Sequence, residues 1–188
     1  MKRIAIFASG EGSNAEAIVK YFADIENVKV EMVLSNKVLA GVHDRMEALS
    51  IPSTSFTKEQ WNEASQILDL LKLKSIDLVV LAGFIAIIPP IFINEYSGRI
   101  INIHPSLLPR HGGMGMWGMN VHKSVIDSGD KESGITIHYV TEQIDGGAII
   151  EQHKCDVEDG ETPETLANKV HQLEYFYYPR AIERLLFQ

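Results

Sequence analysis

Apolar runs of strand length alternate with amphipathic stretches of helix length along most of the chain. The runs are continuous in hydrophobicity, which is typical of strands that are buried on both faces of a parallel sheet. Helices that connect such strands cover both faces of the sheet. The pattern therefore predicts an α/β fold with a mostly parallel sheet of about seven strands and helices on both faces.

The expected elements follow from the positions of these runs. The predicted strands are 3–8, 28–34, 51–54, 78–82, 99–103, 134–141 and 148–153. The predicted helices are 13–24, with Ser13 as its cap, 41–49, 58–73, 120–127 and 163–186, with a kink or break at Pro179. A chain of 188 residues without repeats or linkers is expected to form a single domain over 1–188.

The charge balance restricts the partners of the chain. Lys and Arg number 17 against 25 Asp and Glu, a formal net charge of −8, which disfavours nucleic acid and anionic membranes as partners. The apolar stretch 78–93 is shorter than the roughly 18 residues of a membrane span and contains Pro89 and Pro90. The single cysteine, Cys155, fits a reducing compartment. We expect a cytoplasmic protein that acts on small molecules, and a homodimer is compatible with this.

A glycine-rich turn, SGEGSNA over 9–15, follows the first predicted strand. Glycines allow close approach of a ligand to the backbone, and free N–H groups at a helix N-terminus bind phosphate. The turn also fits a dinucleotide fingerprint, but the end of the second strand carries no acidic residue to hold a ribose. The alternative is a tight turn without a ligand.

Asn102 and His104 lie two residues apart near the end of a predicted buried strand, so their side chains project from the same face. In open α/β sheets ligands bind at the carboxyl ends of the strands. An amide beside an imidazole supplies two donors for an oxygen that gains negative charge, as acyl transfer requires. The alternative is a pair of satisfied polar groups in the core.

Asp145 lies in a tight loop before two glycines and would favour the imidazolium of His104 if this loop folds over it. His138 is as compatible with a half-buried structural role as with a supporting one. The other histidines form no pair at metal-ligand spacing, and Cys155 has no companion cysteine, so no metal is expected.

The segment 109–118, PRHGGMGMWG, follows the strand of Asn102 and His104 directly. Its glycines make ordering costly in entropy, whereas Met114, Met116 and Trp117 provide apolar surface. We expect a lid that closes on bound substrate and excludes water. The alternative is a static surface loop that Trp117 anchors.

Four strings, SGEGSN at 9–14, LAGF at 81–84, NIHPSLLP at 102–109 and DGG at 145–147, occur in the order and spacing of one family. The chain resembles the folate-dependent formyltransferases, and among them the group that acts on glycinamide ribonucleotide. The resemblance covers essentially the whole chain. It implies a Rossmann-like sheet with one antiparallel strand near the C-terminal end, and transfer of a formyl group from 10-formyltetrahydrofolate to the amine of glycinamide ribonucleotide, a step of purine biosynthesis.

The resemblance also implies the site residues. The catalytic residues would be Asn102, His104 and Asp145. Ribonucleotide binding would fall to Gly12, Ser13 and Asn14 at the phosphate and to Glu174 near the sugar. Folate binding would involve Ile85, Ala86, Ile87, Ile88, Asn102 and Lys58. Many family members carry an arginine where this chain has Ala86.

Three alternatives remain at this point. A methionyl-tRNA formyltransferase would need a basic surface, and a formyltetrahydrofolate hydrolase is expected to carry a regulatory domain before the sheet that begins here at Arg3. A nucleotide-binding protein without catalysis would use the glycine turn alone.

Overall fold

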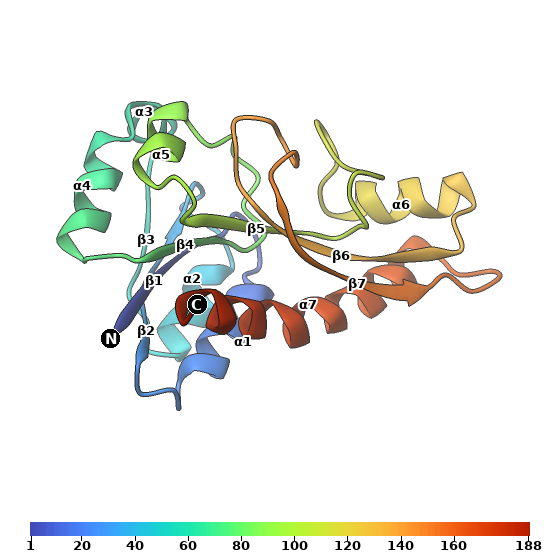
Figure 1. Ribbon diagram of the computed structural model, residues 1–188, viewed down its shortest axis with the longest axis horizontal. Helices are drawn as coiled ribbons and strands as arrows, with labels where there is room; N and C mark the ends of the chain where they lie inside the picture. The colour runs from blue at the N-terminus through green and yellow to red at the C-terminus, as the bar shows by residue number, and fades with distance from the viewer. The chain divides into compact units, whose positions relative to one another are not determined.

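The computed structural model describes residues 1–188 and contains a seven-stranded sheet with the strand order β3-β2-β1-β4-β5-β6-β7 (Figure 1). The strands are β1 (Lys2–Phe7), β2 (Val28–Ser35), β3 (Ser53–Ser55), β4 (Leu78–Leu81), β5 (Ile100–His104), β6 (Glu132–Tyr139) and β7 (Ile149–Asp156). The helices are α1 (Ser13–Phe22), α2 (Val42–Ala48), α3 (Lys58–Glu63), α4 (Ser65–Leu73), α5 (Pro90–Glu95), α6 (Met119–Ser128) and α7 (Pro163–Leu186). The predicted α/β class is confirmed, with parallel pairing among β1 to β4 and antiparallel pairing of β6 with β7.

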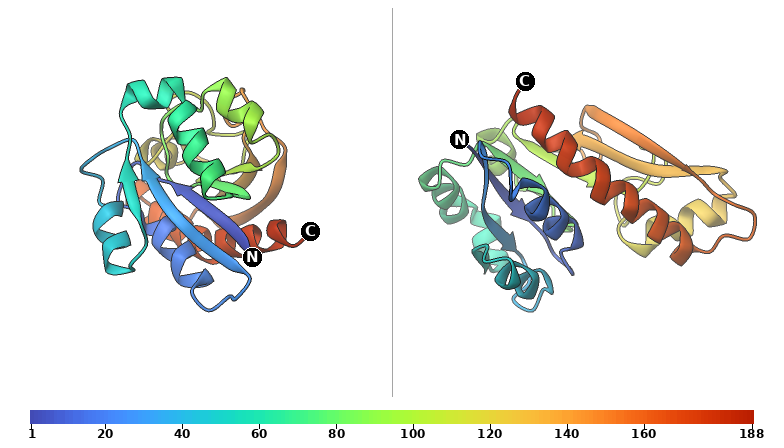
Figure 2. Two further views of the ribbon diagram at one scale, coloured as in Figure 1. Left: turned by 90° about the vertical axis from the view of Figure 1, so that its left-hand side faces the viewer. Right: turned by 90° about the horizontal axis from the view of Figure 1, so that it is seen from below.

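The chain divides into two compact units, Met1–Ile101 and Asn102–Gln188, so the expectation of a single domain stays a prediction. In the first unit β1 pairs with both β2 and β4, and its residues from Ile4 to Phe7 are fully buried. Helices α1 and α2 lie on one side of these strands, and α4 and α5 on the other (Figures 1 and 2). Burial on both faces explains why these strands are continuously apolar.

The second unit is built on the antiparallel pair β6 and β7, in which Ile135 lies opposite His153. The long helix α7 packs on both strands and on α6. Strand β7 is the last in the sheet order, and its residues alternate between exposed and half-buried, as expected of an edge strand.

Three local predictions were wrong. The helix expected over 58–73 is two helices, because Ala64 has a left-handed backbone with φ 56° that ends α3 and starts α4. Ser13 does not cap α1; Gly12 occupies the cap position in the left-handed conformation, without a side-chain hydrogen bond. Of the kink or break expected at Pro179, the break is wrong, because α7 continues to Leu186, and the kink stays a prediction. None of the helices is both long and apolar enough to span a membrane.

Candidate active site

Strand β5 places Asn102 and His104 next to the end of β6. The side-chain amide of Asn102 lies 3.2 Å from Nε2 of His138, a buried residue of β6. His104 is also buried, and its Nε2 donates a 2.8 Å hydrogen bond to the backbone carbonyl of His111. The two residues therefore project toward one region, as their spacing on the strand requires.

Asp145 brings a carboxylate to the same region. Its Oδ2 lies 3.6 Å from Nδ1 of His104, and its Oδ1 lies 3.7 Å from Nε2 of His138. Oδ2 also accepts a 2.8 Å hydrogen bond from the backbone N–H of Gly113. The backbone of Asp145 has φ 53°, an uncommon conformation for a residue other than glycine, of the kind that concentrates at functional sites. The loop thus holds the carboxylate against two histidines.

His138 links the amide to the carboxylate. Its Nδ1 donates to the carbonyl of Tyr139 at 2.9 Å, because a carbonyl can only accept, and this leaves Nε2 as the acceptor for Asn102. Burial lowers the pKa of His138 below its ordinary value, against the raising effects of the Tyr139 carbonyl and the Asp145 carboxylate. A neutral His138 therefore fixes which end of the Asn102 amide carries the N–H groups and leaves one of them for a ligand.

The segment that follows His104 is held by one hydroxyl. Thr136 Oγ1 donates to the carbonyl of Ser106 at 2.7 Å and accepts from the N–H of Leu108 at 2.9 Å and from Gln152 Nε2 at 2.8 Å. The hydroxyl thus uses its donor and both acceptor positions. This bonding fixes the chain between His104 and His111.

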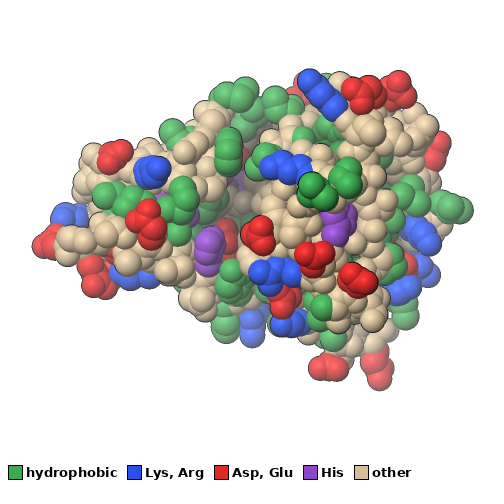
Figure 3. All heavy atoms as spheres, turned by 180° about the vertical axis from the view of Figure 1, so that it is seen from behind, with side chains coloured by type: hydrophobic (Ala, Val, Ile, Leu, Met, Phe, Trp, Pro, Cys, Tyr) green, Lys and Arg blue, Asp and Glu red, His purple; other side chains and the backbone are tan.

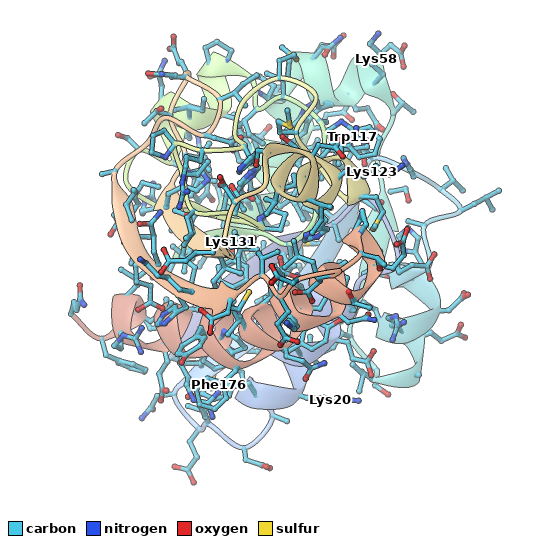
Figure 4. All side chains as sticks on the ribbon, turned by 90° about the vertical axis from the view of Figure 1, so that its right-hand side faces the viewer. Lys20, Lys58, Trp117, Lys123, Lys131 and Phe176 are labelled. Atoms are coloured by element: carbon cyan, nitrogen blue, oxygen red, sulfur yellow. The ribbon has the colours of Figure 1, made fainter.

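The glycine-rich segment 109–118 starts beside Asp145. A Cβ atom on Gly112 would overlap the side chain of Leu108 and come 3.6 Å from Asp145 Oδ2, so only glycine fits here without displacement. Farther along, Met114 is 76% and Trp117 55% exposed (Figure 4). Trp117 does not anchor the segment by burial.

The glycine turn of the first unit precedes helix α1. Gly12 has φ 76°, and a Cβ atom there would overlap the side chain of Val42 on α2 and lie 2.8 Å from its Cα. Glycine is thus required both by conformation and by space. Ser13 and Asn14 are the first residues of α1, whose N-terminal N–H groups form the kind of end that attracts anions.

The segment 85–88 lies over an aromatic cluster of the first unit, made of Phe7, Phe56, Trp61, Phe84 and Phe92. Trp61 Nε1 donates to the carbonyl of Ile87 at 2.8 Å, and the N–H of Ile85 donates to Ser9 Oγ at 3.0 Å. Ile85 and Ile87 are exposed, Ala86 is half-buried and Ile88 is buried. Lys58 starts α3 and projects into solvent (Figure 4).

Glu174 lies on α7 and is buried. Its charge, together with burial as the larger cause, raises the pKa of Tyr178 well above the ordinary value. A buried carboxylate next to a tyrosine hydroxyl can accept hydrogen bonds from ligand hydroxyls as well as from the protein.

Two contacts at this site were not predicted: the His111 carbonyl accepts from His104, and the Gly113 N–H donates to Asp145. Both contacts are made by backbone groups, which every residue type carries.

The face of the molecule in Figure 3 carries acidic and basic side chains intermixed.

Comparisons with known proteins show which family the chain belongs to. The sequence pattern of the formyl transferase family matches residues 2–182. The phosphoribosylglycinamide formyltransferase of Bacillus subtilis is 39% identical over 192 residues, covering 99% of this chain and 95% of the relative. That of Haemophilus influenzae is 35% identical, covering 97% of this chain and 86% of the relative.

Solved structures show the same likeness. The phosphoribosylglycinamide formyltransferase of Bacillus halodurans superposes with a TM-score of 0.89 at 37% identity, covering 98% of this chain and 95% of that one. The glycinamide ribonucleotide transformylase 1 of Geobacillus kaustophilus gives a TM-score of 0.89 at 35% identity, covering 99% of both chains. This chain therefore belongs to the formyl transferase family.

Proposed function

We propose that the protein transfers the formyl group of 10-formyltetrahydrofolate to the amine of phosphoribosylglycinamide, a step of purine biosynthesis. The observation that carries the proposal is the cluster of Asn102, His104, His138 and Asp145, in which one carboxylate lies 3.6 Å from Nδ1 of His104 and 3.7 Å from Nε2 of His138. The full-length similarity to phosphoribosylglycinamide formyltransferases supports the choice of substrates.

In the proposed reaction the amine attacks the formyl carbon, a carbon–nitrogen bond forms, and the carbonyl oxygen becomes negatively charged. The free N–H of Asn102 and the Nδ1–H of His104 donate to that oxygen. At 3.6 Å, Nδ1 is beyond hydrogen-bond distance from Asp145, so its proton is available to the substrate oxygen. The carboxylate stabilises the charged ring by proximity.

Collapse of this intermediate breaks the bond from the formyl carbon to the folate nitrogen. The proton that the amine loses passes through Asp145, directly or through water, to the departing nitrogen. Atoms and charges then balance without a metal or a redox cofactor. The expectation that no metal takes part stays a prediction.

The binding roles are further parts of the proposal. Gly12, Ser13 and Asn14 hold the ribonucleotide phosphate with their N–H groups, and Glu174 accepts from sugar hydroxyls. The exposed side chains of Ile85 and Ile87, the backbone at Ala86 and Ile88, Lys58 and Asn102 contact the folate. A cytoplasmic location, the absence of nucleic-acid and membrane partners, and a possible homodimer are likewise predictions.

A spectroscopic transformylase assay with purified protein tests the proposal. Offered phosphoribosylglycinamide, water and tRNA as competing acceptors of the formyl group, the protein should formylate the ribonucleotide amine. Formylation of tRNA, or release of formate with no acceptor preference, would contradict the proposal and favour another formyl-handling activity.

The segment 109–118 is proposed to close over bound ribonucleotide, since it carries exposed Met114 and Trp117 and starts beside Asp145. Hydrogen exchange at 112–118 should slow when the ribonucleotide is added. Equal protection with and without the ribonucleotide would show that the segment is not a lid.

A further inference from the structure

The side chain of His111 takes no part in the proposed formyl transfer, yet both of its ring nitrogens have hydrogen-bond partners. Its Nε2 donates to Asp130 Oδ2 at 3.0 Å, and its Nδ1 lies 2.8 Å from Ser124 Oγ on α6. Only 12% of this side chain is exposed. Asp130 also pairs with Arg110 at 3.0 Å, so the ring is held from two elements and its acceptor is itself fixed.

The backbone of His111 is in an uncommon conformation. Its φ is 54°, a left-handed value that is unfavourable for a residue with a side chain unless the surroundings hold it. A side chain on the following residue, Gly112, would overlap Leu108. The two hydrogen bonds of the ring hold the His111 side chain in place.

His111 contacts His104 through one backbone atom, its carbonyl oxygen. The His111 carbonyl accepts the Nε2–H of His104 at 2.8 Å, and a carbonyl can only accept, so Nε2 keeps its proton. The opposite ring edge, Nδ1, then faces Asp145. The direction of the His111 carbonyl therefore sets both the proton position and the orientation of the His104 ring.

We propose that His111, anchored by Asp130 and Ser124, is a positioning residue for His104 in the formyl transfer. The proposal rests on the proposed function for its kinetic part only. The position of the His104 proton can be measured whether or not the protein transfers a formyl group. A failure of the His111 proposal can therefore be told apart from a failure of the proposed function.

Two variants remove the anchor from opposite ends. H111N keeps a residue type that tolerates positive φ but loses the ring contacts, and D130A removes the acceptor while leaving the ring. K131Q is the matched control, because it breaks the neighbouring 2.9 Å ion pair of Lys131 with Asp159, a pair that includes neither His111 nor His104. Lys131 is labelled in Figure 4. Thermal unfolding of each variant shows that it is folded.

Two measurements are made on all four proteins. In proton–nitrogen correlation spectra of histidine side chains, assigned by comparison with H104Q, the wild type and K131Q should show a resolved, slowly exchanging Nε2–H signal for His104. H111N and D130A should lose it. Their kcat should fall about 10- to 100-fold, with KM for phosphoribosylglycinamide changed less than about threefold.

Two results would overturn the proposal. One is a His104 Nε2–H signal that is unchanged in both H111N and D130A, whatever their activity. The other is loss of that signal with kcat within about twofold of the wild type. A wild-type protein with the signal but without formyl transfer would overturn the proposed function and leave the hydrogen bond established.

Discussion

Two groups of histidines in the second unit, each buried or half-buried, differ in what surrounds them. His104 and His138 face a carboxylate at 3.6 and 3.7 Å, and Asn102 completes the group. His122 on α6 and His171 on α7 meet edge to face with ring centres 6.3 Å apart. The buried Nδ1 of His122 has no hydrogen-bond partner.

The pKa values express the same difference. Burial, aided by the charges of His171 and His104, lowers the pKa of His122 to about 4, and burial lowers that of His171. For His138 the Asp145 carboxylate and the Tyr139 carbonyl oppose the effect of burial. His104, His138 and His122 are all buried, yet only His104 and His138 have a carboxylate, Asp145, at 3.6 and 3.7 Å. Buried histidines can therefore have different uses, depending on the groups that they face.

The largest expected effect is a difference in kcat between a variant of the first group, H104A, and a variant of the second, H122L. H104A should lose about 10³-fold in kcat, because it removes a donor to the developing oxyanion and the charged ring together. H122L should retain kcat within about threefold, since His122 touches no reacting atom in this account. Steady-state kinetics at pH 7.5 on both variants checks this, and a loss in H122L as large as in H104A would remove the distinction.

Within the first group, N102A should lose about 10²-fold in kcat, the usual effect of one oxyanion donor. H138L should lose less, because it only frees the Asn102 amide to rotate. The kcat values of N102A, H138L and the double variant test whether the loss is larger in N102A than in H138L. A double variant that is no slower than N102A alone would show that His138 acts through Asn102, whereas additive losses would show a separate role.

In the second group, His122 should affect how the free energy of unfolding depends on pH. His122 stays neutral when folded down to pH about 4, whereas the unfolded ring binds a proton near pH 6.5, so folding stability falls as pH falls through this window. From pH 7 to pH 5 the wild type should lose about 2 kcal/mol more than H122L. Urea unfolding at both pH values measures it, and parallel losses in the two proteins would contradict the lowered pKa.

The smallest effect is expected at His171. Burial lowers its pKa, so H171L should also flatten the loss of stability toward acid, with the same sign as H122L. The change should be smaller than in H122L, because burial alone lowers the pKa of His171, whereas neighbouring charges add to burial at His122. An H171L protein that loses more stability on acidification than the wild type would contradict the sign.

Much of the fold was predictable, because continuous apolar runs in the sequence indicate strands that are buried on both faces. The break at Ala64 was not, since alanine is a good helix former and its left-handed backbone is set by packing. Pro179 was expected to kink or break α7, but a proline can stay in a long helix whose packed face supports it on either side.

At the candidate site, the two-residue spacing of Asn102 and His104 predicted a shared direction, and the structure shows it. The approach of Asp145 depended on a loop that local sequence does not determine, and the structure places its carboxylate 3.6 Å from His104. The His111 carbonyl and the Gly113 N–H could not be predicted, because backbone groups are common to all residues.

The most direct test of the central claim, that the Asp145 charge drives the chemistry at His104, is the single-turnover rate of D145N with both substrates bound. Asparagine tolerates the positive φ at this position and can accept the Gly113 hydrogen bond, so the variant removes the charge and, with it, the carboxylate that carries the proton, but keeps the loop contact. The account predicts a chemical step at least about 10²-fold slower, with both substrates bound within about threefold of the wild-type affinity. A chemical step within about threefold of the wild-type rate would contradict it.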